Sequence, residues 1–387
     1  MRSDSSKRAL VYNRFLSTAG GGERACLDLC VALSALGYTI TVVTDPAFKG
    51  DLGDIRAIFG ISSGADWALE RLKDERAIAA FCARGRFDLF VNSTFLSSMP
   101  NPAPRGIYLM MFPQFIGAVE RSNLRSYTTV LTISEFSRIH LEHRWGEGFP
   151  SSVLPPPISS AHTAARPLLE EKERLILLVG RFNVEGHNKC QLDAIRAFRS
   201  MRDEGELSPE WRLHLVGNLN PGAATQRYFD RCRRAAEGAD ITIERNVPFE
   251  RLQNLYRRAA CLWQFTGFGL VDGAEPQNCE HLGLVALDGL AYGTIPFVYE
   301  RSGVSFLIDH GGNGFVFKDR AELSSEMRLL DRSFKGPTHQ AMFRSAIEAS
   351  SQLGCEAFVA RLRVILAEAQ TRPQHHAAPS SQPEIEH

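Results

Sequence analysis

Residues 280–293 read Glu280-His281-Leu282-Gly283-Leu284-Val285-Ala286-Leu287-Asp288-Gly289-Leu290-Ala291-Tyr292-Gly293, the pattern of a loop that enters a helix. The apolar residues from Leu284 onward repeat at helical spacing, and Gly293 supplies a C-terminal stop. Because Gly283 lacks a side chain, an anion can approach the free backbone N–H groups at the helix start. The stretch therefore predicts an anion-binding helix with two carboxylates. Glu280 would lie just before its N-terminus, and Asp288 would lie on the helix.

This pairing of an anion site with two acids suits a nucleotide sugar. The helix start would meet the diphosphate, and the carboxylates would accept hydrogen bonds from sugar hydroxyls. An acidic residue before an amphipathic helix is also an ordinary structural pattern. The local chemistry leaves both interpretations open.

A glycine-rich turn, Gly20-Gly21-Gly22-Glu23-Arg24, follows the first strand-like segment and opens the first helix. Such a turn lets a ligand touch the backbone at a helix N-terminus, although it also serves as a simple tight turn. The chain has neither the GxGxxG spacing of dinucleotide sites nor a GxxxxGK[ST] phosphate loop. These absences weigh against nicotinamide-dependent and ATPase functions.

Two further segments stand at predicted strand ends, where open α/β sheets bind ligands. Arg181, in Val179-Gly180-Arg181-Phe182, and Lys189 could clamp phosphate oxygens, or they could be two surface cations. Val247-Pro248-Phe249 follows another strand, where a nucleotide base could stack or where the side chains could simply join the core.

Strand-like and helix-like segments alternate along both halves of the chain, which predicts an α/β fold with doubly wound parallel sheets. The first half opens as a βαβ unit, and six strands are expected in it. The second half restarts with the apolar run 175–180. The predicted divisions are residues 1–154 for the first domain, 155–172 for a proline-stiffened linker, 173–337 for the second domain, 338–370 for C-terminal helices crossing back to the first domain, and 371–387 for a disordered tail.

The composition indicates an ordinary globular protein of 387 residues. The chain has 44 basic and 44 acidic residues, so its formal net charge is zero. It therefore has no overall positive potential that would attract nucleic acid. We find no signal peptide and no apolar run of the roughly 18 to 20 residues that span a bilayer, so a cytoplasmic location is expected. Eight scattered cysteines predict neither disulfides nor zinc, and no metal site is expected.

Taken in order, these motifs resemble those of retaining glycosyltransferase family 4, also called glycosyl transferases group 1, which has the GT-B fold of two Rossmann-like domains facing across a cleft. The resemblance extends to about Leu366. The motifs that carry it are Gly20-Gly21-Gly22-Glu23-Arg24, Ser134-Glu135-Phe136-Ser137, Val179-Gly180-Arg181-Phe182, Gly186-His187-Asn188-Lys189, Val247-Pro248-Phe249, residues 280–293 and Gly311-Gly312-Asn313-Gly314-Phe315.

The resemblance implies a role for each matching residue. Glu280 would face the donor sugar and Asp288 would hold the ribose, where relatives carry a glutamate. Arg181 and Lys189 would bind the diphosphate together with the backbone N–H groups of Leu284 and Val285 beside Gly283. The remaining donor-binding residues would be Gly21, Gly22, Val247, Pro248 and Phe249. Met111 stands where many relatives carry a histidine near the donor sugar.

The expected function is therefore metal-independent transfer of a sugar, a hexose by resemblance, from a nucleotide-diphosphate donor to a hydroxyl acceptor. The acceptor would be a glycan, a polysaccharide or a lipid-linked saccharide, with peripheral contact at the inner membrane face. No cofactor is expected. The alternatives are another GT-B enzyme such as an epimerase or phosphorylase, a nucleotide-sugar-binding relative with weakened catalysis, and, remotely, a dehydrogenase.

Overall fold

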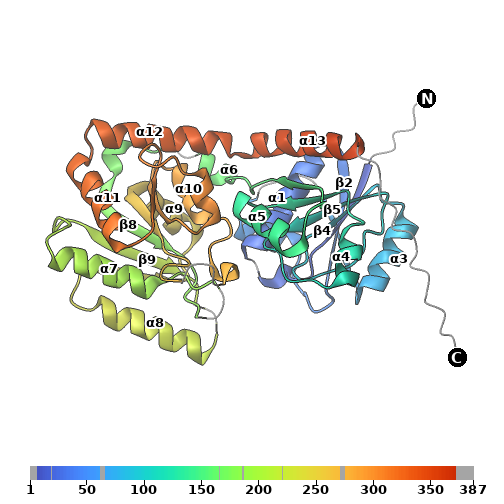
Figure 1. Cartoon of the computed structure of the whole chain (residues 1–387), viewed down its shortest axis with the longest axis horizontal. Helices are drawn as coiled ribbons and strands as arrows, with labels where there is room; N and C mark the ends of the chain where they lie inside the picture. The colour runs from blue at the N-terminus through green and yellow to red at the C-terminus, as the bar shows by residue number, and fades with distance from the viewer. Residues whose placement is uncertain are drawn as a thin grey trace.

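The computed structural model describes residues 7–18, 20–61, 66–164, 166–184, 187–219, 221–270 and 275–371. The chain forms two separate sheets in which every strand pairing is parallel, with helices packed around each sheet (Figure 1). The predicted doubly wound α/β architecture is thus confirmed. The predictions for Gly186 and for a disordered tail lie outside the described residues, except that Thr371 ends the last helix.

The first sheet has seven strands in the order β3-β2-β1-β4-β5-β6-β7, one more than the sequence predicts. We call this sheet and its helices the first domain. Its strands are β1 (Lys7–Tyr12), β2 (Tyr38–Thr44), β3 (Ala68–Arg71), β4 (Leu89–Asn92), β5 (Arg105–Met110), β6 (Thr129–Thr132) and β7 (Ser151–Val153). Its helices are α1 (Gly21–Ala35), α2 (Leu52–Ile58), α3 (Glu75–Gly85), α4 (Ala118–Leu124) and α5 (Glu135–Trp145), with the 3₁₀ turn η1 (Leu16–Thr18).

Alternation along the central strand β1 explains why helices cover both faces of this sheet. Ala9 and Val11 belong to the core beneath α1, whereas Leu10 and Tyr12 point to the opposite core with α3 and α5 residues. Successive side chains of a strand point to opposite faces, so a central strand buried on both sides reads as a continuous apolar run.

The second sheet has six strands in the order β10-β9-β8-β11-β12-β13, and with its helices it forms the second domain. Its strands are β8 (Glu173–Val179), β9 (Arg212–Gly217), β10 (Ile241–Arg245), β11 (Ala259–Gln264), β12 (Ile295–Tyr299) and β13 (Phe315–Phe317). Its helices are α7 (Gln191–Asp203), α8 (Ala223–Ala236), α9 (Phe249–Arg258), α10 (Leu284–Leu290) and α11 (Arg320–Ser333), with the 3₁₀ turns η3 (Pro276–Asn278) and η4 (Gly303–Leu307). Both sheets reverse their strand order beside their first strand, β1 or β8, and open α/β sheets bind ligands at such a point, outside the carboxyl ends of the strands.

The chain crosses between the domains twice, and the two crossings lie side by side. The first crossing leads from β7 through three prolines to α6 (Ser160–Thr163) and η2 (Leu169–Glu171). The second joins α12 (Pro337–Gln352) to α13 (Cys355–Thr371). The backbone N–H of Ile158 donates to the carbonyl of Leu353 at 2.9 Å, which ties the crossings together.

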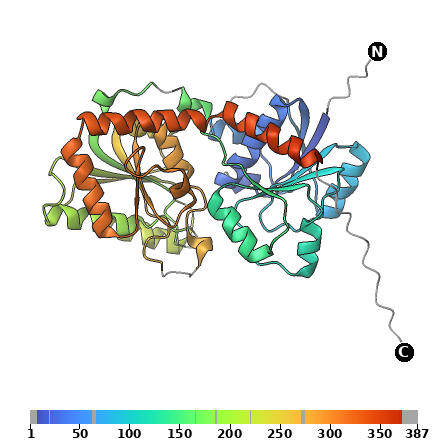
Figure 2. The ribbon, with the colours of Figure 1, turned by 45° about the horizontal axis from the view of Figure 1, so that its top comes forward.

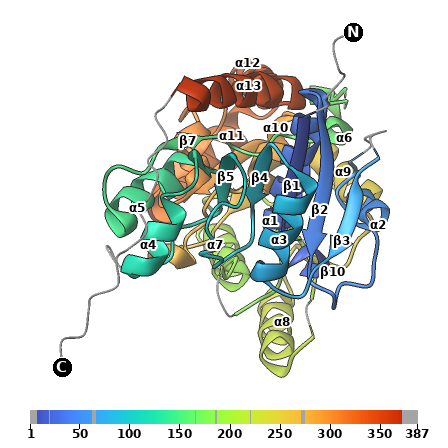
Figure 3. The same cartoon turned by 90° about the vertical axis from the view of Figure 1, so that its right-hand side faces the viewer.

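The last two helices run along one flank of the molecule (Figures 1 and 2). α12 contacts α10 and α11 of the second domain, whereas α13 contacts α1 of the first. Figure 3, which faces the first domain, shows α13 at the edge of that domain on the same side as α12. The sequence limits given above for the domains stay a prediction. Within the described residues, no helix combines the length and apolarity that crossing a membrane requires.

Candidate active site

A partly buried ion pair between Glu280 and Lys189 lies at the carboxyl edge of the second sheet. The Lys189 ammonium is 2.6 Å from Oε2 of Glu280. The same oxygen accepts hydrogen bonds from Thr266 at 3.2 Å and Gln264 at 3.4 Å, which follow and end β11. Burial alone would raise the pKa of Glu280, but Lys189 and His187 outweigh it and hold the pKa at about 2. The carboxylate is therefore ionised throughout the neutral pH range.

Gly180 explains how Lys189 reaches this position. Lys189 folds over the end of β8, and a Cβ atom at Gly180 would lie 2.5 Å from its Cγ. The Gln191 amide donates to the carbonyls of Gly180 and Arg181, each at 3.0 Å, and so fixes the turn. Arg181 itself is exposed. The structure thus places both predicted phosphate-binding cations on the loop that follows β8.

Helix α10 begins where the sequence predicts. Gly283 precedes it with φ +90°, a conformation that glycine adopts without strain, and a Cβ there would lie 3.0 Å from Val304. The first two N–H groups of the helix, at Leu284 and Val285, make no backbone hydrogen bond within the described residues. The helix is only seven residues long.

The glycine turn of the first domain faces this helix. A Cβ atom at Gly21 would lie 3.7 Å from Leu284, and one at Gly22 would lie 3.7 Å from Met111. Glu23 closes the N-terminus of α1 by accepting from the backbone N–H of Gly20 at 2.8 Å. The structure therefore brings Gly21 and Leu284 together across the two domains.

His281 is a site residue for which the sequence predicted no role. Its ring stacks on Phe112 of the first domain, with centroids 4.2 Å apart, and meets His187 edge-on at 4.3 Å. Burial and the neighbouring His187 keep the pKa of His281 well below its usual range. Its Nε2 atom is buried and has no hydrogen-bond partner among the described residues. The only sequence signal was its place directly after Glu280.

Ser134 joins the domains beside His281. Its hydroxyl accepts from the N–H of Ser137 at 3.1 Å, which caps α5, and it donates to the carbonyl of His281. Gly303 is required here, because a Cβ would lie 1.8 Å from that carbonyl. The Ser137 hydroxyl donates to the carbonyl of Met111 at 2.7 Å. Ser134 and Ser137 therefore fix the loop that faces the second domain.

Asp288 lies in a different environment from Glu280. Arg24 of α1 donates to both oxygens of its carboxylate, at 3.0 and 3.2 Å, and also to the carbonyl of Pro157. His162 lies 3.6 Å away from the same carboxylate. The two acids of the 280–293 stretch therefore have separate partners, and the ribose contact predicted for Asp288 would require the Arg24 pair to open. Arg24 appears in the glycine-turn motif, but nothing in the sequence indicated this partner.

The Val247-Pro248-Phe249 segment leads into α9. Val247 is half-buried against the core, and Pro248 occupies the position before the helix. The Phe249 ring lies 5.1 Å from that of His162, and its edge approaches Gly60 of the first domain. The segment thus meets the linker between the domains, and base stacking there stays a prediction. In the described residues, no three His, Cys, Asp or Glu side chains gather closely enough to hold a metal ion.

Residues 161–346 match the family model described as Glycosyl transferases group 1. No curated protein matches the chain by sequence. Among solved structures, a glycosyltransferase from Rickettsia africae ESF-5 is similar with a TM-score of 0.73 and 13% identity, over 95% of this chain and 100% of that one.

Two other solved structures are similar to this chain over almost its whole length. Sucrose-phosphate synthase from Thermosynechococcus elongatus has a TM-score of 0.69 and 15% identity, over 94% of this chain and 99% of that one. Anabaena Alr3699/HepE, in complex with UDP and glucose, has a TM-score of 0.64 and 14% identity, over 94% of this chain and 100% of that one.

Proposed function

We propose that this chain, which belongs to the glycosyl transferases group 1 family through residues 161–346 and has the GT-B fold, is a metal-independent retaining glycosyltransferase. It transfers a sugar, by expectation a hexose, from a nucleotide-diphosphate donor to a hydroxyl group. The observation that carries the proposal is the partly buried Lys189–Glu280 pair beside the start of α10, at the switch point of the second sheet and opposite the first domain.

The donor would bind mainly to the second domain. Lys189, exposed Arg181 and the N–H groups of Leu284 and Val285 would hold the diphosphate. Glu280 would accept hydrogen bonds from the donor sugar, since it is ionised and already positioned by Lys189. Gly21 and Gly22 would form the opposing wall. Val247, Pro248 and Phe249 would lie toward the base, and Asp288 toward the ribose.

The reaction would form a bond from an acceptor oxygen to the sugar's anomeric carbon as the bond to the diphosphate breaks on the same face. The departing diphosphate takes the acceptor's proton, so no separate base is needed. Lys189 and Arg181 stabilise the negative charge that develops on the diphosphate, which is the main protein contribution in this mechanism. Closure of the two domains around the donor would exclude water.

The acceptor would bind to the first domain, and a glycan, a polysaccharide or a lipid-linked saccharide fits the expectation. For a lipid-linked acceptor, the protein would work in the cytoplasm at the inner membrane face. The structurally similar HepE protein was crystallised in complex with UDP and glucose, which supports nucleotide sugars as the first donors to test.

A ligand screen tests donor binding directly. Thermal unfolding is measured with UDP, GDP, ADP and their sugars. A ligand at about 100 times its Kd stabilises the native state by roughly 2.7 kcal/mol and raises Tm by several degrees. We expect one nucleotide series to raise Tm and its sugar to be consumed, with product analysis identifying transfer. Unchanged Tm in every series would contradict the proposal.

Replacing Lys189 with methionine tests the charge stabilisation. Loss of this cation should lower kcat for sugar transfer by roughly 10²-fold or more, because it acts on the leaving group in the transition state. The control is Lys318→Met, which removes an exposed lysine that pairs with Glu322 on the surface. Equal turnover of the two variants would remove Lys189 from the mechanism.

A further inference from the structure

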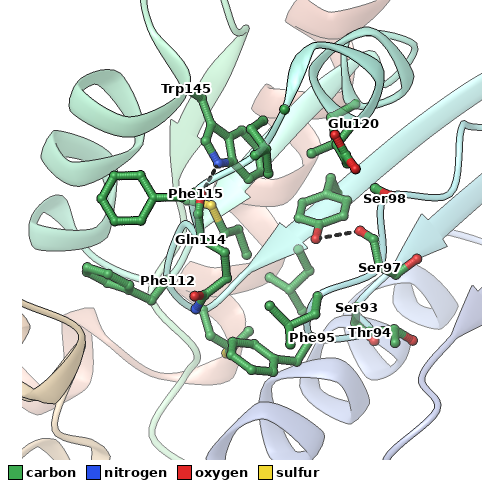
Figure 4. Close-up of a pocket in the computed structure, with 18 residues that line it drawn as sticks. Ser93, Thr94, Phe95, Ser97, Ser98, Phe112, Gln114, Phe115, Glu120 and Trp145 are labelled. Atoms are coloured by element: carbon green, nitrogen blue, oxygen red, sulfur yellow. Dashed lines mark hydrogen bonds between the residues drawn. The ribbon is translucent and has the colours of Figure 1, made fainter.

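A pocket of about 270 Å³ opens in the first domain at the carboxyl ends of β4 and β5. Its walls are the loop after β4, the loop after β5, the start of α4 and Trp145 of α5 (Figure 4). The volume lies just below the roughly 300 to 1,000 Å³ typical of small-molecule sites. It has room for one sugar ring rather than for a long glycan.

The rim of this pocket carries large apolar side chains that face solvent. Phe95 is 48% exposed, Leu96 64% and Phe115 80%, and Val119 on α4 beside the pocket is 70% exposed. Leu96 also has φ +65°, a left-handed conformation that a leucine rarely adopts and that costs free energy. Exposed apolar groups that gather around a cavity are typical of a binding surface.

Polar side chains complete the pocket. Ser98, Gln114 and Glu120 come from the loop after β4, the loop after β5 and the first turn of α4. Their side chains make no hydrogen bond to another described residue, whereas the hydroxyls of Ser97 and Tyr108 are already engaged with Glu75 and the Ser97 carbonyl. Three side chains can therefore donate to or accept from a ligand's hydroxyl groups.

The pocket adjoins the candidate active site. Met111 and Phe112 line it. The other side of the same residues meets the catalytic centre, since Phe112 stacks on His281 and Met111 lies beside Gly22. Met111 and Phe112 therefore lie between the pocket and the residues beside Glu280.

We propose that this pocket binds the acceptor, and that the acceptor is a glycoside with an apolar alkyl aglycone. Ser98, Gln114 and Glu120 hold hydroxyl groups of the acceptor sugar, while Phe95, Leu96 and Phe115 contact the alkyl chain. The inference rests on the proposed glycosyl transfer, because that reaction requires an acceptor beside the donor. Among the acceptors considered above, it selects those linked to a lipid-like chain.

The test uses octyl β-D-glucopyranoside below its micelle concentration and methyl β-D-glucopyranoside as the sugar without the chain. Saturation-transfer NMR measures which ligand protons contact the full-length protein. We expect strong transfer to the octyl chain, and at least a fivefold weaker signal from the methyl glycoside. The variant Leu96→Ala and a second variant, Phe115→Ala, should each reduce the octyl signal severalfold.

The matched control is Leu168→Ala, which removes a leucine of similar exposure, 57%, from the linker rather than from the pocket. Equal octyl signals in Leu96→Ala and Leu168→Ala, or equal binding of the two glycosides by the unmodified protein, would overturn the inference. The nucleotide screen is run on the same samples. If nucleotides raise Tm but the octyl glycoside does not bind selectively, only the inference about the alkyl-binding pocket is rejected. If the octyl glycoside binds selectively but no nucleotide raises Tm, only the proposed glycosyl transfer is rejected.

Discussion

Arg24 stands between two buried carboxylates and pairs fully with only one of them. Its two terminal nitrogens bind Asp288, and its Nε lies 3.7 Å from Asp28 without a hydrogen bond. Burial would raise the pKa of Asp288, but Arg24 and His162 hold it below its usual value. For Asp28, burial prevails over the attraction of Arg24 and raises the pKa to about 7. One cation therefore leaves one of the two acids able to take a proton near neutral pH.

The raised pKa of Asp28 predicts a specific pH dependence of stability. Between about pH 4 and 7 the folded chain keeps a proton that the unfolded chain has released, so the free energy of unfolding falls as the pH rises through this window. Asp28→Asn cannot ionise and should remove this fall, which amounts to about 1 to 4 kcal/mol. Urea unfolding at pH 5 and pH 8.5 measures the effect.

The comparison for this measurement is Asp203→Asn, at an exposed aspartate ending α7. It should keep the pH dependence of the unmodified protein. Parallel pH profiles for Asp28→Asn and the unmodified protein would show that Asp28 does not titrate in this window.

At the scale of single residues, the sequence predicted candidates but not their pairings. Glu280 and Lys189 were both selected, yet their ion pair spans 91 positions and depends on Gly180 leaving space for the lysine. Arg24 and Asp288 are 264 positions apart. The first pairing depends on how two loops of the second sheet meet and the second on how the two domains meet, and this information is absent from local spacing. The sequence indicated no role for His281 or Asp28, because the shifted pKa values of both side chains come from burial.

Helix α5 shows how one capping residue can also serve as a contact between domains. Ser134 caps the helix, and its hydroxyl also donates to the carbonyl of His281. Asp319 caps α11 in the same way, accepting from the N–H of Glu322 at 2.9 Å, but within one domain. The two caps form a natural pair for comparison.

Replacing either cap by alanine should lower the free energy of unfolding by about 1 kcal/mol through the lost cap. Ser134→Ala should cost about 1 kcal/mol more, because the His281 carbonyl also loses its donor. Hydrogen exchange read by mass spectrometry should rise over residues 276–284 in Ser134→Ala and stay unchanged there in Asp319→Ala. The same exchange in both variants would mean that the hydroxyl does not hold the second domain.

At the scale of elements, regular buried segments were predictable and short edge strands were not. Helix α10 followed from its apolar spacing between two glycines, and β8 from its continuous apolar run. Strand β3 is an edge strand of four residues, Ala68 to Arg71, all partly or fully exposed, so it has no apolar signature. β7 and β13 have three residues each and also lie at sheet edges, and β7 directly precedes the prolines. Their pairing comes from the neighbouring strand rather than from their own composition.

For the whole molecule, the buried Arg24–Asp288 pair joins the domains next to the two chain crossings. Arg24→Met should lower the free energy of unfolding by about 3 to 5 kcal/mol, because Asp288 would stay buried without its cation. The double variant Arg24→Met, Asp288→Leu should recover much of that loss, since no unpaired charge remains. Urea unfolding measures both.

Arg138→Met provides the surface reference. Arg138 pairs with Glu135 and Glu142 along the exposed side of α5, and exposed pairs contribute about 1 kcal/mol or less. A loss in Arg24→Met no larger than in Arg138→Met would mean that the pair between the domains adds little to stability.

The packing of α13 on α1 also has a consequence for biosynthesis. The first domain is assembled from two stretches separated by about 200 residues, which lie between β7 and α13 and include the whole second sheet. A ribosome adding roughly 5 to 20 residues per second needs about 10 to 40 s to make that insertion. During this interval one face of α1 stays exposed to solvent. In the complete chain α13 packs on that face, with Phe358, Leu362 and Leu366 in the shared core. The nascent first domain is therefore exposed to chaperones and to aggregation until its last helix emerges.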